Sequence, residues 1–184
     1  MTSGKGKTAF TTKQLVIDAV LAALCIILGY AGAMLDFKVI KITFESAPVI
    51  VGALMFGALD GALIGFVGLT VTQLILYPLS PTTPLWILPY VVCGLAVGSW
   101  AKRFNYYNSK KQLIVIAIAA ELIVTLLNTA AIIADSLLYH YYSVATVWVP
   151  LAPRLGIAVA KGVALGFILP PLLQAMAKVT GRRK

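Results

Sequence analysis

Residues 112–136 read QLIVIAIAAELIVTLLNTAAIIADS, and this stretch excludes an ordinary soluble fold. A helix needs roughly 20 mostly apolar residues to cross the hydrocarbon core of a bilayer, and this run is longer than that. The whole chain agrees, because 60% of its 184 residues are hydrophobic, 11% are charged and the mean hydropathy is +0.95. These values are typical of an integral membrane protein.

Other apolar runs lie on both sides of this stretch. Together they predict six membrane-spanning helices, at about 14–33, 46–58, 61–78, 85–101, 112–136 and 152–177, of which the second is short. Six spans leave no length for a soluble domain. We therefore predict an all-α integral membrane protein with a single transmembrane domain over residues 1–184 and short tails at about 1–13 and 178–184.

The positive charge is distributed in a way that predicts the orientation of the chain. The formal net charge is +9, and eleven of the 15 basic residues border apolar runs. They form clusters at Lys5, Lys7 and Lys13, at Lys102 and Arg103, at Lys110 and Lys111, and at Lys178, Arg182, Arg183 and Lys184. Six spans bring these clusters to one compartment, which the positive-inside rule identifies as the cytoplasm. We therefore predict cytoplasmic N- and C-termini, the lipid bilayer as surroundings and no nucleic-acid partner.

A polar stripe interrupts the last two apolar runs. Glu121, Asn128 and Asp135 are seven residues apart, so they project from nearly one helix face at intervals of about 10 Å. Arg154 and Lys161 have the same spacing on the sixth predicted span. Because these two spans run antiparallel, we expect Asp135 level with Arg154 and Asn128 level with Lys161.

The stripe has two interpretations, because isolated polar groups must avoid hydrocarbon and face protein or water. In the first, it lines an outward-opening cavity in which Asn128 and Lys161 bind a polar or anionic solute. In the second, a buried ion pair and hydrogen bonds only hold helices together, as in a structural membrane subunit. Glu121 lies closer to the cytoplasmic end and fits an internal helix contact.

Aromatic residues near the predicted outer surface extend the same pattern. Residues 77–90, YPLSPTTPLWILPY, contain Tyr77, Trp86 and Tyr90, and Gln73 lies one turn below Tyr77. Trp86 and Tyr90 are four residues apart and share a helix face. They form either an interfacial aromatic belt or the wall of a pocket for a vitamin-sized solute.

The sequence gives little support to catalysis or metal binding. Cys25 and Cys93 lie in apolar spans, and His140 is the single histidine. We predict no catalytic residue, no metal site and no cofactor in this chain. The competing class is a small intramembrane enzyme that uses Glu121, Asp135 and His140 as acid–base groups.

Small residues mark the helices that can approach each other closely. Ala19, Ala22 and Ala23 form a small-residue face on the first predicted span, suited to a partner helix or to internal packing. The predicted third and fourth spans carry glycines that favour close packing, namely Gly61, Gly65, Gly68, Gly94 and Gly98.

Residues 41–68, KITFESAPVIVGALMFGALDGALIGFVG, carry a family resemblance. With the six-span plan and the spacing of Ala19 and Ala23, they resemble the substrate-binding S-components of energy-coupling factor (ECF) vitamin transporters over nearly the whole chain. Many members have proline where this chain has Ala58. The resemblance implies that the alanine face docks on a transmembrane coupling subunit and that the segment from Asp36 to Glu45 acts as a lid.

The resemblance also places the vitamin site among the last three spans and the outer loops. With the polar stripe and the aromatic residues, it gives eight candidate substrate-binding residues: Gln73, Tyr77, Trp86, Tyr90, Asn128, Asp135, Arg154 and Lys161. Arg154 and Lys161 favour a small carboxylate, and residues 80–90 are most similar to pantothenate members. Folate, cobalamin and hydroxymethylpyrimidine are the alternatives.

The mechanism implied by the resemblance is vitamin import across a bacterial plasma membrane. The chain would bind its vitamin outside with high affinity and then reorient in the membrane. Its partners would be the coupling subunit and two ATPase subunits of an ABC-type complex. ATP and magnesium would bind to the ATPase subunits, so this chain would not itself be an enzyme.

Overall fold

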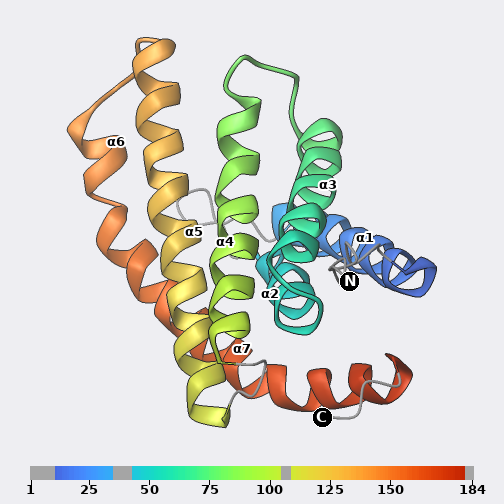
Figure 1. Cartoon of the computed structure of the whole chain (residues 1–184). Coiled ribbons are helices and arrows are strands. Elements are labelled where there is room, and N and C mark those ends of the chain that lie inside the picture. The colour runs from blue at the N-terminus through green and yellow to red at the C-terminus, as the bar shows by residue number, and fades with distance from the viewer. Residues whose placement is uncertain (1–10, 35–42, 105–108, 181–184) are drawn as a thin grey trace, which may run out of the picture.

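A computed structural model describes residues 11–34, 43–104 and 109–180, and all regular secondary structure in these ranges is helical. The helices are α1 (Thr12–Met34), α2 (Ser46–Met55), α3 (Ala58–Leu76), α4 (Thr83–Arg103), α5 (Lys110–Leu138), α6 (Val144–Trp148) and α7 (Leu151–Thr180) (Figure 1). Five segments are long and apolar enough to cross a membrane, with α6 and α7 counted as one. The predicted all-α membrane fold is confirmed.

Helix α2 is the short second helix, and it forms the centre of the molecule. Its 10 residues rise about 15 Å, half the thickness of the hydrocarbon core. Nine of the 10 residues are buried, and α2 contacts all of the long helices, namely α1, α3, α4, α5 and α7. The helix was predicted to reach residue 58 but ends at Met55, because Gly57 has a φ of 124°, which glycine adopts without strain. The chain then turns directly into α3.

Close glycine contacts join the long helices in pairs, as the sequence predicts for α3 and α4. A Cβ atom built on Gly94 would lie 2.4 Å from the carbonyl carbon of Gly61. On the other side of the bundle, a Cβ on Gly162 would lie 2.5 Å from Cα of Ile118. The second contact fixes which residues of α5 and α7 lie level with each other, and these residues form much of the candidate site.

The last span begins earlier than predicted. Residues 144–148 form α6 instead of a loop, because the Ser143 hydroxyl caps this helix by accepting a hydrogen bond from the backbone N–H of Thr146 at 3.0 Å. Helix α7 follows after Pro150 and bends near Pro170 and Pro171, which cannot donate backbone hydrogen bonds (Figure 1).

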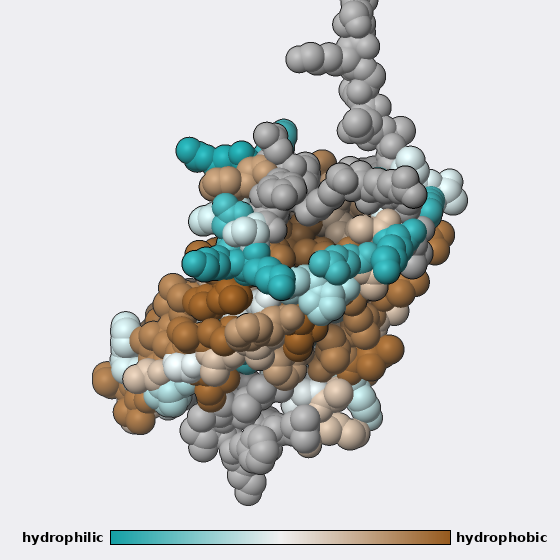
Figure 2. All heavy atoms as spheres, turned by 90° about the horizontal axis from the view of Figure 1, so that it is seen from below, coloured by the Kyte–Doolittle hydropathy of each residue, from teal (hydrophilic) through white to brown (hydrophobic). Residues whose placement is uncertain are grey.

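Four of the predicted basic residues lie together at one end of the bundle. Lys102 and Arg103 end α4, Lys110 begins α5, and Lys178 lies in the last turn of α7, and all four are exposed. Figure 2 shows hydrophilic side chains across this end, with apolar surface around them. The α3–α4 and α5–α6 connections lie at the opposite end (Figure 1).

Candidate binding site

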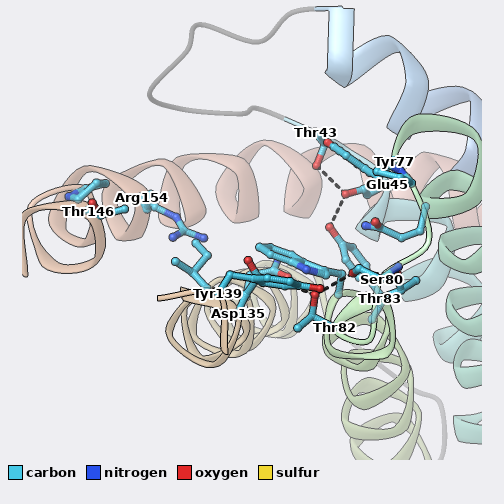
Figure 3. A pocket seen from close by; sticks show the side chains of 17 residues that line it. Thr43, Glu45, Tyr77, Ser80, Thr82, Thr83, Asp135, Tyr139, Thr146 and Arg154 are labelled. Atoms are coloured by element: carbon cyan, nitrogen blue, oxygen red, sulfur yellow. Dashed lines mark hydrogen bonds between the residues drawn. The ribbon is translucent and has the colours of Figure 1, made fainter. Parts of the chain in front are cut away.

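A cavity of about 720 Å³ lies among α3, α4, α5 and the start of α7, toward the end opposite the basic clusters (Figure 3). Pockets of this volume hold small organic molecules. Its lining residues are Thr43, Glu45, Gln73, Tyr77, Pro78, Ser80, Thr82, Thr83, Trp86, Tyr90, Asn128, Ile132, Asp135, Tyr139, Thr146, Pro150 and Arg154.

Glu45 forms a polar centre on one side of this cavity. It directly precedes α2 and is 5% exposed. Its Oε1 atom accepts hydrogen bonds from the hydroxyls of Thr43, at 3.1 Å, and of Tyr90. Its backbone oxygen accepts a hydrogen bond from the thiol of Cys25 at 3.3 Å. These contacts fix the start of α2 against α1 and α4.

A second polar group lies deeper, where Lys161 contacts Glu121. Nζ of Lys161 and Oε2 of Glu121 are 2.8 Å apart, and the Glu121 side chain is 1% exposed. The hydroxyl of Ser46 donates to the other oxygen of Glu121. Lys161 also lies 5.7 Å from the ring centre of Phe44. A smaller cavity of about 80 Å³ adjoins this pair and shares Arg154 with the larger one.

This salt bridge corrects the predicted alignment of α5 and α7. Lys161 is level with Glu121 and not with Asn128, so Arg154 lies near Asn128 and not beside Asp135. The difference is one heptad. It arises because the last span starts at α6, so the chain has already descended along α5 when α7 begins.

Asp135 lies near the mouth of the cavity, where hydroxyl groups surround it. It accepts a hydrogen bond from Thr82 at 2.5 Å (Figure 3). It also accepts one from the phenol of Tyr141 in the α5–α6 connection. Because the carboxylate of Asp135 stabilises the protonated phenol, the pKa of Tyr141 rises to about 12. The bond from Thr82 joins the start of α4 to the last turns of α5.

Arg154 projects toward the cavity from α7 (Figure 3). It is partly buried, and its side chain makes no hydrogen bond and no salt bridge with any residue of the described ranges. Partly buried guanidinium groups usually pair with a carboxylate or another acceptor. Among the described lining residues, Arg154 is therefore the cation that is available to a ligand.

Seven of the eight candidate residues line the larger cavity, namely Gln73, Tyr77, Trp86, Tyr90, Asn128, Asp135 and Arg154. The eighth, Lys161, lines the smaller cavity and pairs with Glu121. That these residues contact a substrate stays a prediction.

Several polar residues of the cavity wall are not predicted by the sequence pattern. Thr43 and Glu45 were assigned to an exposed lid segment, yet both are buried; the rest of that segment, 36–42, lies outside the described residues. Their only signal is position, since they directly precede a fully apolar short helix. Thr82, Thr83 and Thr146 line the cavity from connections or helix starts and show no helical periodicity.

The small-residue face of α1 contains two alanines and not three. Ala19 and Ala23 are exposed, whereas Ala22 is 5% exposed, and a Cβ built on Gly68 would lie 3.2 Å from its carbonyl oxygen. Ala22 therefore packs against α3 and does not face outward with the other two, and its role in docking stays a prediction. Ala19 and Ala23 stay candidate docking residues.

The structure does not bring together the groups of the enzyme alternative. Glu121 and Asp135 line different cavities, and His140 lines neither of the two. Within the described residues, no group of three or more histidine, cysteine, aspartate or glutamate side chains is placed to hold a metal ion. Cys25 and Cys93 are buried free thiols.

Comparisons with known proteins agree with this fold. The family model described as "ECF transporter, substrate-specific component" matches residues 13–176. A solved structure described as the S component of a bacterial ECF transporter aligns with a TM-score of 0.60 and 18% identity, covering 92% of this chain and 98% of that chain. No curated protein matches the sequence significantly. Because the family model spans most of the chain, this protein belongs to the substrate-specific components of ECF transporters.

Proposed function

We propose that this chain captures a small carboxylate from outside the cell with high affinity, and that the substrate is pantothenate. The observation that carries this proposal is Arg154, a guanidinium on the cavity wall with no acceptor among the described residues. A guanidinium matches a carboxylate with two parallel, charge-assisted hydrogen bonds. The cavity volume of about 720 Å³ is ample for such a molecule.

The structure reduces the cationic character that the sequence suggested. Lys161 is 2.8 Å from Glu121, which offsets its charge, so carboxylate recognition falls to Arg154. Pantothenate and folate both carry carboxylates, whereas cobalamin and hydroxymethylpyrimidine carry none. Arg154 therefore favours the first two of the four vitamins.

The proposed transport cycle uses the rest of the chain. The vitamin enters the cavity at the end opposite the basic clusters, and the part of the predicted lid that precedes Thr43 closes over it. Ala19 and Ala23 contact the transmembrane coupling subunit. Two ATPase subunits bind ATP and magnesium, and their cycle reorients the loaded chain so that the vitamin is released into the cytoplasm of a bacterial cell.

A binding screen on the purified protein tests this proposal. Pantothenate, folate, cobalamin and hydroxymethylpyrimidine are titrated by calorimetry, and we expect submicromolar binding of pantothenate. Panthenol, which replaces the carboxylate by an alcohol, should bind about ten- to a hundredfold more weakly, as expected for a lost charged hydrogen bond. Arg154→Gln should remove this difference between pantothenate and panthenol.

Three results would count against the proposal. If none of the four vitamins binds at submicromolar concentration, the vitamin assignment is wrong. If Arg154→Gln keeps full discrimination against panthenol, Arg154 does not bind the carboxylate. If the isolated chain turns over a lipid or prenyl substrate, the enzyme alternative replaces the transporter.

A further inference from the structure

The charged residues of the cavity do not balance one another. Glu45, Asp135 and Arg154 line it, and none of the three forms a salt bridge within the described residues. Among the described lining residues, two carboxylates face one guanidinium, so their summed formal charge is negative. A ligand that offers only a carboxylate would satisfy Arg154 and leave both acidic residues facing further negative charge. The cavity is therefore complementary to a ligand that carries hydrogen-bond donors in addition to a carboxylate.

Glu45 has spare hydrogen-bonding capacity. Both hydroxyls that reach it, from Thr43 and Tyr90, donate to the same atom, Oε1. Within the described residues Oε2 accepts no hydrogen bond, and it is not among the fully enclosed polar atoms that lack a partner. A carboxylate has about four acceptor positions, so two of them are unused here. Oε2 therefore keeps some accessible surface in a cavity-lining residue, and it can accept a hydrogen bond from a ligand donor.

Glu45 and Arg154 lie on opposite sides of the cavity. Figure 3 shows the guanidinium of Arg154 on one side and Thr43 and Glu45 on the other, with Asp135 between them near the mouth. Glu45 is held there by residues of other helices, since Tyr90 comes from α4 and Cys25 from α1. The carboxylate is thus fixed before a ligand arrives, which is the condition for discriminating between ligands.

We infer that Glu45 is a specificity residue that accepts a hydrogen bond from a hydroxyl, amide or amine of the substrate, while Arg154 binds a carboxylate at the substrate's other end. This inference rests on the proposed function. It restricts the substrate to molecules with a donor group at one end and an anion at the other. Pantothenate meets this requirement through its hydroxyls, and folate through the exocyclic amine of its ring. A plain fatty or dicarboxylic acid does not.

Matched ligand pairs test the role of Glu45. The first pair is pantothenate and its dideoxy analogue, in which hydrogen replaces both hydroxyls; the second is folate and the analogue that lacks the exocyclic amine. We expect the wild-type protein to prefer the natural member of the pair that it binds by about ten- to a hundredfold, the range for a hydrogen bond to a charged group. Glu45→Gln should reduce this preference to about threefold or less, because a neutral amide accepts less strongly.

Asp135→Asn is the matched control, since it removes a carboxylate from the mouth of the same cavity. It should change the affinity for both members of a pair by the same factor. An unaltered thermal unfolding temperature would show that each variant is folded. If Glu45→Gln does not fold, the wild-type preference between the two ligands decides.

The outcomes separate the inference from the proposed function. Equal wild-type affinity for both members of a pair, or a preference that Glu45→Gln leaves unchanged, would overturn the inference while substrate binding stands. A preference removed by Asp135→Asn instead would move the donor site to the mouth. If only cobalamin or hydroxymethylpyrimidine binds, the inference that the substrate has a donor group at one end and a carboxylate at the other is wrong. Binding of none of the four vitamins would overturn the proposed function, and the inference with it.

Discussion

Lys161 and Glu121 form a salt bridge deep in the bundle. We expect this salt bridge to stabilise the fold and not to contact the substrate. Lys161→Met leaves a carboxylate that is 1% exposed without its cation. Breaking a buried pair on one side destabilises a protein by about 3–5 kcal/mol, so we expect a clearly lower unfolding temperature in detergent. The double variant Lys161→Met with Glu121→Gln should recover most of the loss, because no buried charge remains unpaired.

The opposite result would give Lys161 a different role. If Lys161→Met unfolds like the wild type but loses pantothenate binding, Lys161 contacts the substrate as the sequence first suggested. Arg154→Gln provides the comparison. We expect it to weaken binding and leave the unfolding temperature nearly unchanged, because Arg154 has no partner among the described residues whose loss would destabilise the fold.

Asp18 is the clearest unfavourable residue in the described part of the chain. It is 7% exposed, neither of its carboxyl oxygens has a hydrogen-bond partner there, and it interacts with the carboxyl of Asp60 on α3. Asp18→Asn removes one of two adjacent acidic groups and adds a donor that can reach Asp60. We expect about 1–3 kcal/mol of stabilisation, measured as a higher unfolding temperature. Asp18→Leu, which adds no donor, should stabilise less.

The elements show which features the sequence predicts and which it does not. The apolar runs predicted the order of the long helices because each span must cover the hydrocarbon core with its own residues. The alignment of α5 with α7 was wrong by one heptad, because it depends on where α6 begins. That start is set by a single cap at Ser143 inside a segment of outer-loop composition.

The site residues likewise divide into those that the sequence predicts and those that it does not. Residues on regular helices, such as Asn128 and Trp86, were identified because periodicity shows which ones share a face. Glu45 was assigned to a lid, because the local sequence does not indicate that the chain is already buried before α2 begins. Its burial depends on Tyr90, Cys25 and Gly29, which are distant in sequence. Contacts of that kind cannot be predicted from periodicity.

The pairing of α3 with α4 depends on glycine at position 94. A Cβ atom there would lie 2.4 Å from a backbone atom of Gly61, and backbone cannot move aside as a flexible side chain can. Gly94→Val should therefore separate the two helices and lower stability by about 1–3 kcal/mol or more, measured by thermal unfolding. Gly156→Val is the control, because nothing lies within 4 Å of its Cβ position. Similar losses in both variants would show that valine itself is the cause.

At the scale of the whole molecule, α1 presents an apolar surface that the other described residues leave exposed. Val16, Val20 and Ile27 are 58%, 63% and 62% exposed, and Ala19 and Ala23 lie among them. In lipid such a surface needs no cover, so apolar exposure alone does not identify an interface. The two alanines leave room for a neighbouring helix to approach the backbone closely, which larger side chains would prevent.

This geometry predicts that substitutions on α1 can abolish assembly with the coupling subunit without weakening vitamin binding. Ala19→Trp with Ala23→Trp should block close approach on α1, so the chain should no longer co-purify with a co-expressed coupling subunit and its two ATPase subunits. The isolated variant should bind pantothenate as the wild type does, because neither alanine lines the cavity. Ala164→Trp, at an exposed alanine of α7, is the control and should still assemble. If the α1 variant assembles normally and supports ATP-dependent uptake, the coupling subunit binds elsewhere. If the control also fails to assemble, tryptophan disturbs membrane insertion. Leucine at the same positions, a smaller change, then tests whether the α1 face binds the coupling subunit.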